Sequence, residues 1–260
     1  MTSSDDPSWD AEVAQLAGTG PASVMTAYLR RLPAGYRAIT SPPEAIEDQA
    51  VVSRLEAAEG PPGWAPAPEG GPPLPGSLPL MGASHQLVVR PSHDRSSTFR
   101  LRRFGAAGIE LTTTLPLLES FGLVVVEAVP MRLAPAVADG TEIHVDDIGL
   151  RADAPYGPEA LRFVAEVHGD RLVDAIEACA HGRADVDSLN RLVTAAGLDW
   201  RQVMVLRAYL RYWRQSGVAL SWAQMTDPLV AYPDVARALV GYFEARFDPD
   251  AADGPGPAPG

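Results

Sequence analysis

The chain has 260 residues and a formal net charge of −12, with 33 acidic side chains against 21 basic ones. This acidic balance excludes the broad positive surface of a nucleic-acid-binding protein and disfavours an anionic membrane as a partner. The single cysteine, Cys179, rules out an internal disulfide, and no apolar run approaches the roughly 18 residues of a membrane span, so we expect a soluble cytoplasmic chain.

The N-terminal region, residues 1–59, is predicted to be helical after a frayed start. The sequence begins MTSSDDPSWD, which is acidic and lacks the apolar core of a signal peptide, and residues 1–20 are predicted to form a loose leader. Helices are expected over 22–32 and 43–58. The second of these carries acidic residues near its start, where they interact favourably with the helix dipole.

A linker is predicted over residues 60–84. Eight prolines and six glycines between Gly60 and Gly82 leave no room for a regular element. The run Pro72-Pro-Leu-Pro75 could be a ligand for a proline-recognition domain, but ordinary loop composition is the better explanation.

Residues 85–182 alternate between strand and helix patterns and predict an α+β unit. Strands are expected over 86–90, 98–104, 123–133 and 142–150, and helices over 112–121 and 156–180. The order strand, helix, strand, strand, helix is most of a ferredoxin-like β-α-β-β-α-β unit. No sixth element is visible after Ala180, so the strand over 86–90 is predicted to take the free edge.

Individual residues within this unit predict where its elements begin and which faces they bury. Thr113 or Thr114 is expected to cap the helix over 112–121, with Pro116 in the first turn and Gly122 just past the end. In the strand over 123–133, the residues expected to share one face are Val125, Val129, Met131 and Leu133.

Residues 183–249 are predicted to be entirely helical, and residues 250–260 to be a flexible tail. Helices are expected over 186–196, 200–216, 222–231 and 234–247. The residues that mark their ends are the N-caps Asp199 and Ser221 and the glycines Gly197 and Gly217. The expected buried stripe of the second helix is Val203, Leu206, Leu210 and Trp213.

A basic face lies beside that stripe and consists of Arg207, Arg211 and Arg214. Together with Tyr209 and Tyr212 it could contact phosphate groups of a nucleotide or nucleic acid. Ion pairs with the acidic surface of a neighbouring domain are the favoured interpretation, because the chain as a whole is strongly acidic.

Few residues have the spacing of a catalytic or metal site. His144, Asp146 and Asp147 resemble a ligand cluster, but the other histidines have no matching spacing, so a solvent-facing strand end is favoured. His168 lies in an apolar helical pattern and is interpreted as a core residue, and Cys179 as a small buried side chain. The turn from Gly105 to Gly108 is neither a dinucleotide fingerprint nor a phosphate loop.

Several motifs in the last part of the chain resemble one enzyme family. They are Asp187-x-x-Asn190-Arg-Leu-Val, Gly197-Leu-x-Trp-Arg, Leu206-Arg-Ala-Tyr-x-x-Tyr-x-Arg-Gln215 and Phe243-Glu-Ala-Arg-Phe-Asp-Pro249. They resemble the segment just upstream of the catalytic domain in the large bacterial NAD-dependent glutamate dehydrogenases. The run Leu115-Pro-x-Leu-Glu-x-x-Gly122 resembles the ACT-like regulatory module of that family. The resemblance extends from about Ala22 to Pro249.

The resemblance implies a noncatalytic regulatory or structural portion of an enzyme that converts L-glutamate, NAD and water to 2-oxoglutarate, ammonia and NADH. It implies NAD in the full-length enzyme but no cofactor in this chain. It also implies a catalytic half supplied in cis or by another chain, and a homo-oligomeric full enzyme. All 21 basic residues are arginine, which codon bias in a GC-rich genome explains best. Whatever the cause, no lysine chemistry can happen in this chain, whereas enzymes of this kind use lysines in the active site.

The resemblance further implies roles for particular residues. The residues expected at an interface with the catalytic domain are Asn190, Trp200, Arg201, Arg207, Tyr209, Tyr212, Arg214, Gln215, Arg246 and Asp248. ACT-like modules often bind amino acids near their first strand–helix turn, which here implies an effector site. The residues of that site would be Gly105, Gly108, Glu119 and Gly122, with a simple tight turn as the alternative.

Two other functions stay open at this stage. The chain could be a free-standing ACT-like module that binds an amino acid and reports to another partner, or an unrelated helical scaffold. A reading frame for the catalytic half immediately downstream would favour the dehydrogenase portion. Saturable amino-acid binding without such a frame would favour the free-standing module.

Overall fold

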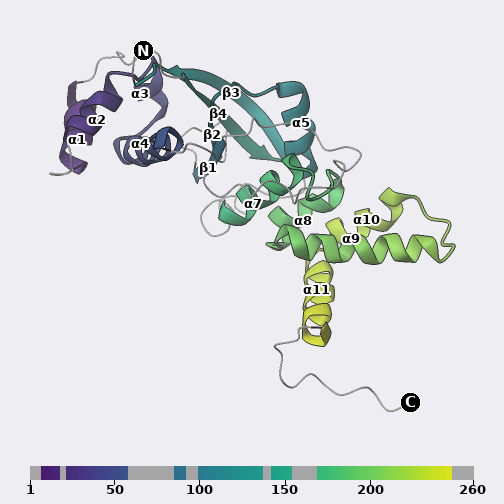
Figure 1. The fold of residues 1–260 in the computed structure, drawn as a ribbon. Coiled ribbons are helices and arrows are strands. Elements are labelled where there is room, and N and C mark those ends of the chain that lie inside the picture. The colour runs from purple at the N-terminus through teal and green to yellow at the C-terminus, as the bar shows by residue number, and fades with distance from the viewer. Residues whose placement is uncertain are drawn as a thin grey trace.

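The computed structural model describes residues 7–17, 22–57, 85–91, 99–136, 142–153 and 169–247. A four-stranded sheet lies at the centre, between the N-terminal helices and the C-terminal helices (Figure 1). The predicted linker, the predicted tail, the first part of the helix expected over 156–180, and His168 lie outside the described residues. None of the helices described is both long and apolar enough to cross a membrane.

The sheet confirms the α+β prediction and the unusual position of its first strand. Its strands are β1 (His85–Pro91), β2 (Phe99–Gly105), β3 (Leu123–Leu133) and β4 (Ile143–Ala152), in the order β1-β2-β4-β3. Every neighbouring pair is antiparallel. Strand β1 lies beside β2, at the edge that the sixth element of a ferredoxin-like unit would take, so it completes the sheet from the N-terminal side.

The two helices of this unit are α5 (Leu111–Ser120) and α7 (Gly169–Ala180). Glu110 is the N-cap of α5, so the prediction that Thr113 or Thr114 caps it is wrong; the Thr113 hydroxyl donates to the Glu110 carbonyl instead. Pro116 therefore lies inside α5, beyond its first turn. Gly122 has a φ of 74° and ends the helix as predicted, with its N–H on the Glu119 carbonyl.

The two faces of the sheet pack against different helices. One face contributes Phe99, Leu101, Ile148 and Leu150 to a core shared with α5, α7 and the C-terminal helices. The other face contributes residues to a second core with the N-terminal helices, namely Phe104, Met131, Leu133, Ile143 and Val145. Strands β2 and β4 are covered on both faces and lack a solvent-exposed face, whereas the edge strand β3 exposes Val126, Ala128, Pro130 and Arg132.

A β-bulge overturns the face assigned to β3. The pairing with β4 shifts between Val125 and Glu127, so one extra residue enters β3. Side chains before and after such an insertion point to opposite faces. Val125 packs on the first core, whereas Val129, Met131 and Leu133 pack on the second, so the four do not share a face.

The N-terminal region contains four helices: α1 (Pro7–Leu16), α2 (Ala22–Leu29), α3 (Tyr36–Ile39) and α4 (Pro42–Ala57). The expectation of a loose leader is wrong for residues 7–16. Trp9 and Val13 of α1 are buried, and the indole N–H of Trp9 donates to the Thr40 carbonyl at 2.9 Å. This tryptophan anchors α1 against the rest of the N-terminal helices.

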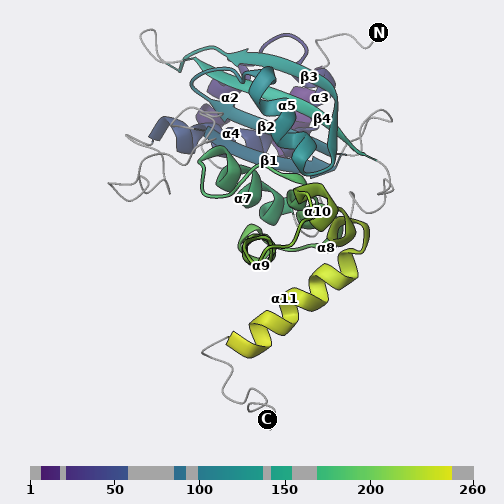
Figure 2. The same cartoon turned by 90° about the vertical axis from the view of Figure 1, so that its right-hand side faces the viewer.

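The C-terminal region is helical, as predicted, and ends in a projecting helix. It comprises a 3₁₀ turn η1 (Ser188–Asn190), α8 (Arg191–Ala196), α9 (Trp200–Gln215), α10 (Trp222–Ala231) and α11 (Pro233–Phe247). Figure 2 shows α11 extending away from the body of the protein. Asp199 and Ser221 form capping boxes, and Gly197 and Gly217 have positive φ, which confirms these four end signals.

The buried stripe of α9 is shorter than predicted. Val203, Leu206 and Leu210 are buried, whereas Trp213 is 46% exposed. From Arg211 to Gly217 every residue is exposed, so the last turns of α9 extend beyond the core.

Candidate functional site

Asn190 joins the sheet unit to the C-terminal helices. It is 3% exposed, and its side-chain N–H groups donate to Ser120 Oγ of α5 at 3.1 Å and to the Asp185 carbonyl at 2.9 Å. Its carbonyl oxygen accepts a hydrogen bond from Arg207 of α9 at 3.2 Å. A buried amide with this many partners fixes the relative position of the elements that it bonds.

Asn190 and Arg207 together form a polar seam between the sheet unit and the C-terminal helices. The side chain of Arg207 is 2% exposed, and two of its nitrogens donate to the Asp187 carboxylate at 2.8 Å each. Asp187 also caps η1 through the Leu189 N–H. Two of the three arginines of the basic face, Arg207 and Arg211, thus pair with Asp185 within the chain and not with a neighbouring domain. Asn190 and Arg207 lie inside the protein and not at its surface.

Other residues expected at an interface do lie on the surface. Tyr212 is 73% exposed, and Tyr209 is 50% exposed although its ring meets Phe243 edge-on at 6.0 Å. Arg214 and Gln215 are exposed, and Arg201 stacks over Trp200 with its guanidinium carbon 4.3 Å from the ring centre. Arg246, on α11, stacks over Phe247. Asp248 lies outside the described residues.

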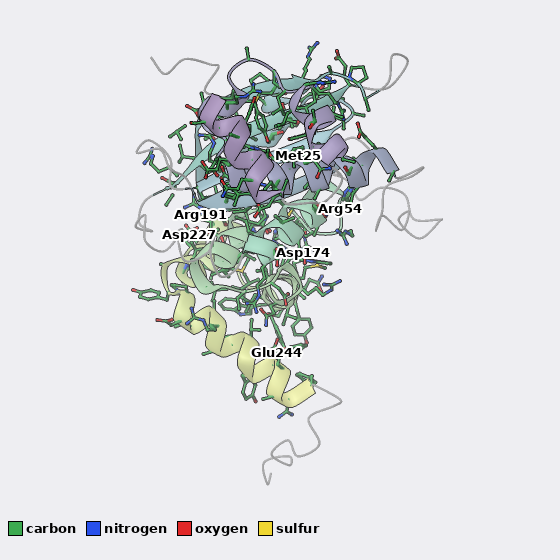
Figure 3. The ribbon with its side chains drawn as sticks, turned by 90° about the vertical axis from the view of Figure 1, so that its left-hand side faces the viewer. Met25, Arg54, Asp174, Arg191, Asp227 and Glu244 are labelled. Atoms are coloured by element: carbon green, nitrogen blue, oxygen red, sulfur yellow. The ribbon has the colours of Figure 1, made fainter. Side chains whose placement is uncertain are left out.

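The exposed apolar side chains concentrate at this end of the molecule. Among the described residues, ten of the fourteen exposed large apolar side chains lie between Met204 and Phe247. On α11, Val235, Leu239 and Tyr242 follow each other at helical spacing and are 51%, 48% and 66% exposed. Figure 3 shows side chains projecting from α11 into open space on the part of the helix that carries Glu244. Soluble monomeric domains rarely expose large apolar side chains in such a concentration.

A second polar seam holds the N-terminal helices on the sheet. Asp48 of α4 is fully buried and pairs with Arg90 of β1 at 2.7 Å and with Arg102 of β2. Arg102 also pairs with Asp147 of β4, which is fully buried as well. The arginines on this face of the sheet are therefore not solvated but are neutralised by carboxylates from two directions.

Two tyrosines extend this seam towards the outside of the N-terminal helices. The Tyr36 hydroxyl donates to Asp48 at 2.5 Å, and the Tyr28 hydroxyl lies 3.0 Å from that of Tyr36. Burial, and after it the negative charge of Asp48, raise the pKa of both tyrosines, so both hydroxyls stay protonated.

The turn between β2 and α5 is filled by an internal carboxylate. Asp146 is 5% exposed, accepts the Ile109 N–H at 3.2 Å and pairs with Arg103 at 3.1 Å. Burial, opposed by Asp146, lowers the pKa of Arg103. Gly108 is exposed, and a Cβ atom there would lie 3.4 Å from His144 Nδ1. The interpretation of Asp146 and Asp147 as a solvent-facing strand end is wrong, because both pair with arginines inside the protein.

The structure does not bring the candidate metal ligands together. In the described part of the chain, no group of three or more histidine, cysteine and carboxylate side chains could hold a metal ion.

Of the other residues predicted for the effector site, Glu119 is exposed, and Gly122 packs against the side chain of Arg191. Cys179 is 2% exposed, as predicted, and burial raises the pKa of its thiol to about 12. It is therefore unreactive as a nucleophile.

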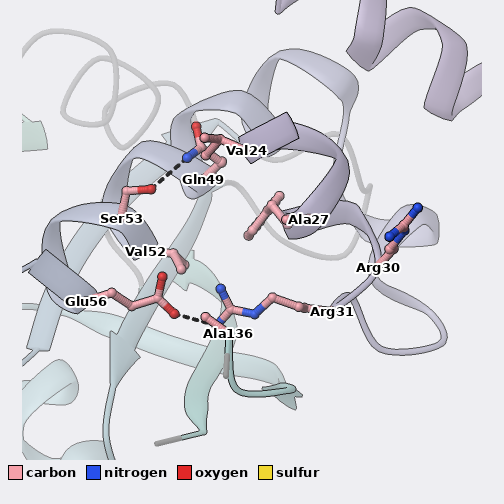
Figure 4. A pocket seen from close by; sticks show the side chains of 10 residues that line it. Val24, Ala27, Arg30, Arg31, Gln49, Val52, Ser53, Glu56 and Ala136 are labelled. Carbon is pink, nitrogen blue, oxygen red and sulfur yellow. Dashed lines mark hydrogen bonds and ion pairs between the residues drawn. The ribbon is translucent and has the colours of Figure 1, made fainter. Parts of the chain in front are cut away.

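A cavity between α2 and α4 was missed by the sequence reasoning (Figure 4). It has a volume of about 500 Å³, and one end of it is closed by the ion pair between Arg31 and Glu56 at 2.6 Å. The polar residues Gln49, Ser53 and Glu56 recur on one face of α4, which was the only signal available in the sequence.

The sheet unit and the C-terminal helices both match models of the same family. Residues 85–162 match the model described as glutamate dehydrogenase, ACT3 domain, and residues 184–249 match glutamate dehydrogenase, helical motif 3. NAD-specific glutamate dehydrogenase of Mycobacterium tuberculosis is 34% identical over 163 residues, which are 62% of this chain and 10% of that relative. The chain belongs to the NAD-specific glutamate dehydrogenase family.

Two further relatives of the same name agree with this membership. The protein of Halomonas elongata is 33% identical over 58% of this chain and 9% of its own length. That of Pseudomonas aeruginosa is 35% identical over 54% of this chain and 8% of its own length. The chain thus spans about a tenth of the length of the curated dehydrogenases that it matches. Helices α1 to α4 lie outside both family-model matches.

Proposed function

We propose that this chain is a noncatalytic regulatory and bracing portion of a cytoplasmic NAD-dependent glutamate dehydrogenase. It would act together with a catalytic half, supplied in cis or by another polypeptide, that binds NAD and oxidises L-glutamate to 2-oxoglutarate and ammonia. The full enzyme would be a homo-oligomer. The absence of lysine from the sequence supports a noncatalytic role, because arginine cannot replace a lysine whose pKa must fall for proton transfer.

The observation that carries this proposal is the exposed apolar surface of α9 and α11. It belongs to the region that matches helical motif 3, and it contains aromatic side chains that a soluble protein rarely leaves uncovered in such number. The same two helices carry Arg201, Arg211, Arg214 and Arg246, on a chain that is acidic as a whole. A partner that presents apolar side chains ringed by carboxylates would fit this surface.

The effector turn remains part of the proposal in a restricted form. An amino acid at the turn from Gly105 to Gly108 would have to compete with Asp146 for the Ile109 N–H. A ligand site of this kind would therefore need the ion pair of Asp146 with Arg103 to rearrange.

The test measures NADH production from glutamate and NAD by this chain alone and mixed with the separately expressed catalytic half of a relative. We expect no turnover by the chain alone and restored or altered turnover in the mixture. Leu239→Glu should weaken the effect by about tenfold or more, because a charge enters the apolar face of α11. Leu16→Glu, at a position 51% exposed against 48% for Leu239, is the matched control and should change nothing.

Turnover by the chain alone above a buffer blank would show that the proposed division between this chain and a catalytic half is wrong. If Leu239→Glu and Leu16→Glu change turnover in the mixture equally, the interface with the catalytic half does not lie on α11. A mixture with no change in turnover would favour a free-standing regulatory module.

A further inference from the structure

The cavity between α2 and α4 has the form of a small-molecule site. One wall is formed by Val24, Ala27 and Tyr28 of α2 with Arg30 and Arg31 just beyond its end, the other by Gln49, Val52, Ser53 and Glu56 of α4, and Ala136 completes the lining. The residues on each helix recur at helical spacing, so a face of α2 opposes a face of α4 across the space (Figure 4). The volume of about 500 Å³ falls within the range of roughly 300–1,000 Å³ that is typical of ligand pockets.

One end of the cavity presents a positive and a negative group side by side. Arg31 Nη2 donates to Glu56 Oε1 at 2.6 Å, and Arg31 Nε donates to the Ala134 carbonyl at 2.6 Å. Within the described residues, Arg31 Nη1 and Glu56 Oε2 have no further hydrogen-bond partner. The side chains are 11% and 33% exposed, so both groups can still be reached from the cavity.

The walls become less polar with distance from this ion pair. Gln49 Nε2 donates to Ser53 Oγ at 2.7 Å, which leaves the serine hydroxyl as a donor and the glutamine carbonyl as an acceptor. Val24, Ala27 and Val52 provide apolar surface. The cavity therefore offers a ligand three kinds of contact: the charged pair of Arg31 and Glu56, hydrogen bonds with Gln49 and Ser53, and apolar surface.

We infer that this cavity binds a free α-amino acid with a neutral side chain. Its carboxylate would lie on Arg31, its ammonium group on Glu56, and its side chain against Val24, Ala27 and Val52. Arg31 and Glu56 already neutralise each other at 2.6 Å, so a ligand with a net charge would leave that charge unbalanced at this end of the cavity. A zwitterion, which carries both charges a few bonds apart, satisfies both groups.

A ligand there would contact the polar seam that joins the N-terminal helices to the sheet. Tyr28 lines the cavity, and its hydroxyl meets Tyr36, whose hydroxyl donates to Asp48. Asp48 pairs with Arg102 of β2. The inference goes beyond the proposed function, because binding by this chain requires no catalytic half and its test contains none.

The experiment measures thermal shifts and calorimetric binding of the common L-amino acids to the full chain. The first variant, Ala27→Trp, fills the cavity and keeps every polar group. The second, Arg31→Gln, removes the guanidinium group that would bind the carboxylate of the amino acid. Arg37→Gln is the matched control, because it breaks a comparable ion pair, with Asp10 at 2.9 Å, outside the cavity. Melting curves of each variant without ligand verify that it folds.

We expect at least one neutral amino acid to bind saturably to the chain and to the Arg37→Gln variant. Affinity should fall by about tenfold or more in both cavity variants, and likewise for the N-acetylated and carboxamide analogues of that amino acid. The inference is overturned if no amino acid binds to the unaltered chain. It is also overturned if Ala27→Trp binds as tightly as the unaltered chain, or if the blocked analogues bind as tightly as the free amino acid.

Discussion

Removal of the Asp48 carboxylate is the sharpest perturbation that the structure suggests. This side chain is fully buried, and its oxygens pair with Arg90 at 2.7 Å and with Arg102, and accept the Tyr36 hydroxyl at 2.5 Å. Asp48→Ala leaves two guanidinium groups with one partner fewer, and their side chains are only 8% and 3% exposed. Water therefore cannot replace the missing carboxylate fully.

The expected cost follows from what each arginine retains. Breaking a buried ion pair from one side costs about 3–5 kcal/mol. Arg102 keeps Asp147, and Arg90 keeps Glu47, so we expect the lower end of this range, about 3 kcal/mol in the free energy of unfolding.

Glu47→Ala is the matched control for Asp48→Ala. Glu47 pairs with the same nitrogen of Arg90 at 3.1 Å, but its side chain is 65% exposed. An ion pair this exposed contributes about 0.5 kcal/mol or less, because water and salt screen it. Each variant thus removes one carboxylate partner of Arg90, a buried one in Asp48→Ala and an exposed one in Glu47→Ala.

Urea unfolding, followed by circular dichroism, measures both changes. We expect Asp48→Ala to lower the unfolding midpoint clearly and Glu47→Ala to leave it nearly unchanged. Asp48→Asn, which keeps the shape and one acceptor, should fall between them and gives a reading if the alanine variant fails to fold. Equal and small losses in Asp48→Ala and Glu47→Ala would refute the reasoning, since burial would then not control the cost.

Four further outcomes are expected. Asn190→Ala should lower the free energy of unfolding by about 2 kcal/mol in urea titration, because Arg207, Ser120 and the Asp185 carbonyl each lose one hydrogen-bond partner inside the protein. Burial raises the pKa of Cys179 from 9.0 to about 12, so at pH 8 the thiolate fraction should be roughly a thousandfold smaller in the folded chain than in the unfolded chain. A thiol reagent should therefore react quickly with Cys179 only after urea is added. The pKa of Cys179 is higher in the folded chain than in the unfolded chain, so its contribution to stability should be complete below about pH 9 and should be lost as the pH rises towards 12. Unfolding measured at a series of pH values would detect this loss. Asp199→Ala should cost about 1 kcal/mol in thermal unfolding through the loss of the capping box of α9, and an unchanged melting temperature would contradict this.

The elements that the sequence predicted well are those whose signals are local. The caps of α9 and α10 are decided within four residues, since Asp199 and Ser221 bond the chain three residues further on. The positions of the four strands follow from short apolar and β-branched runs. The place of β1 at the sheet edge was predicted because a ferredoxin-like unit has one position left for it.

Apart from the N-cap of α5, the main failures depend on contacts between distant parts of the chain. Trp9 is ordered by Thr40, and no local pattern reveals that pairing. From the sequence alone, Asp147 is interpreted as part of a solvent-facing strand end, because its buried partner Arg102 lies 45 residues away in the sequence. The cavity between α2 and α4 likewise requires that two helical faces meet, and each face alone reads as an ordinary amphipathic surface.

The two ends of the molecule could communicate through the sheet. The N-terminal helices with the cavity and the projecting helix α11 lie at opposite ends of the protein (Figure 1). If an amino acid in the cavity changes the affinity for a catalytic half, coupling requires an element whose state both sites influence. The seam of Asp48 and Arg102 is the polar connection between the cavity and β2. We therefore expect Asp48→Asn to retain amino-acid binding, because Arg31 and Glu56 are untouched, but to reduce any effect of that amino acid on the partner. An undiminished effect in this variant would locate the coupling elsewhere.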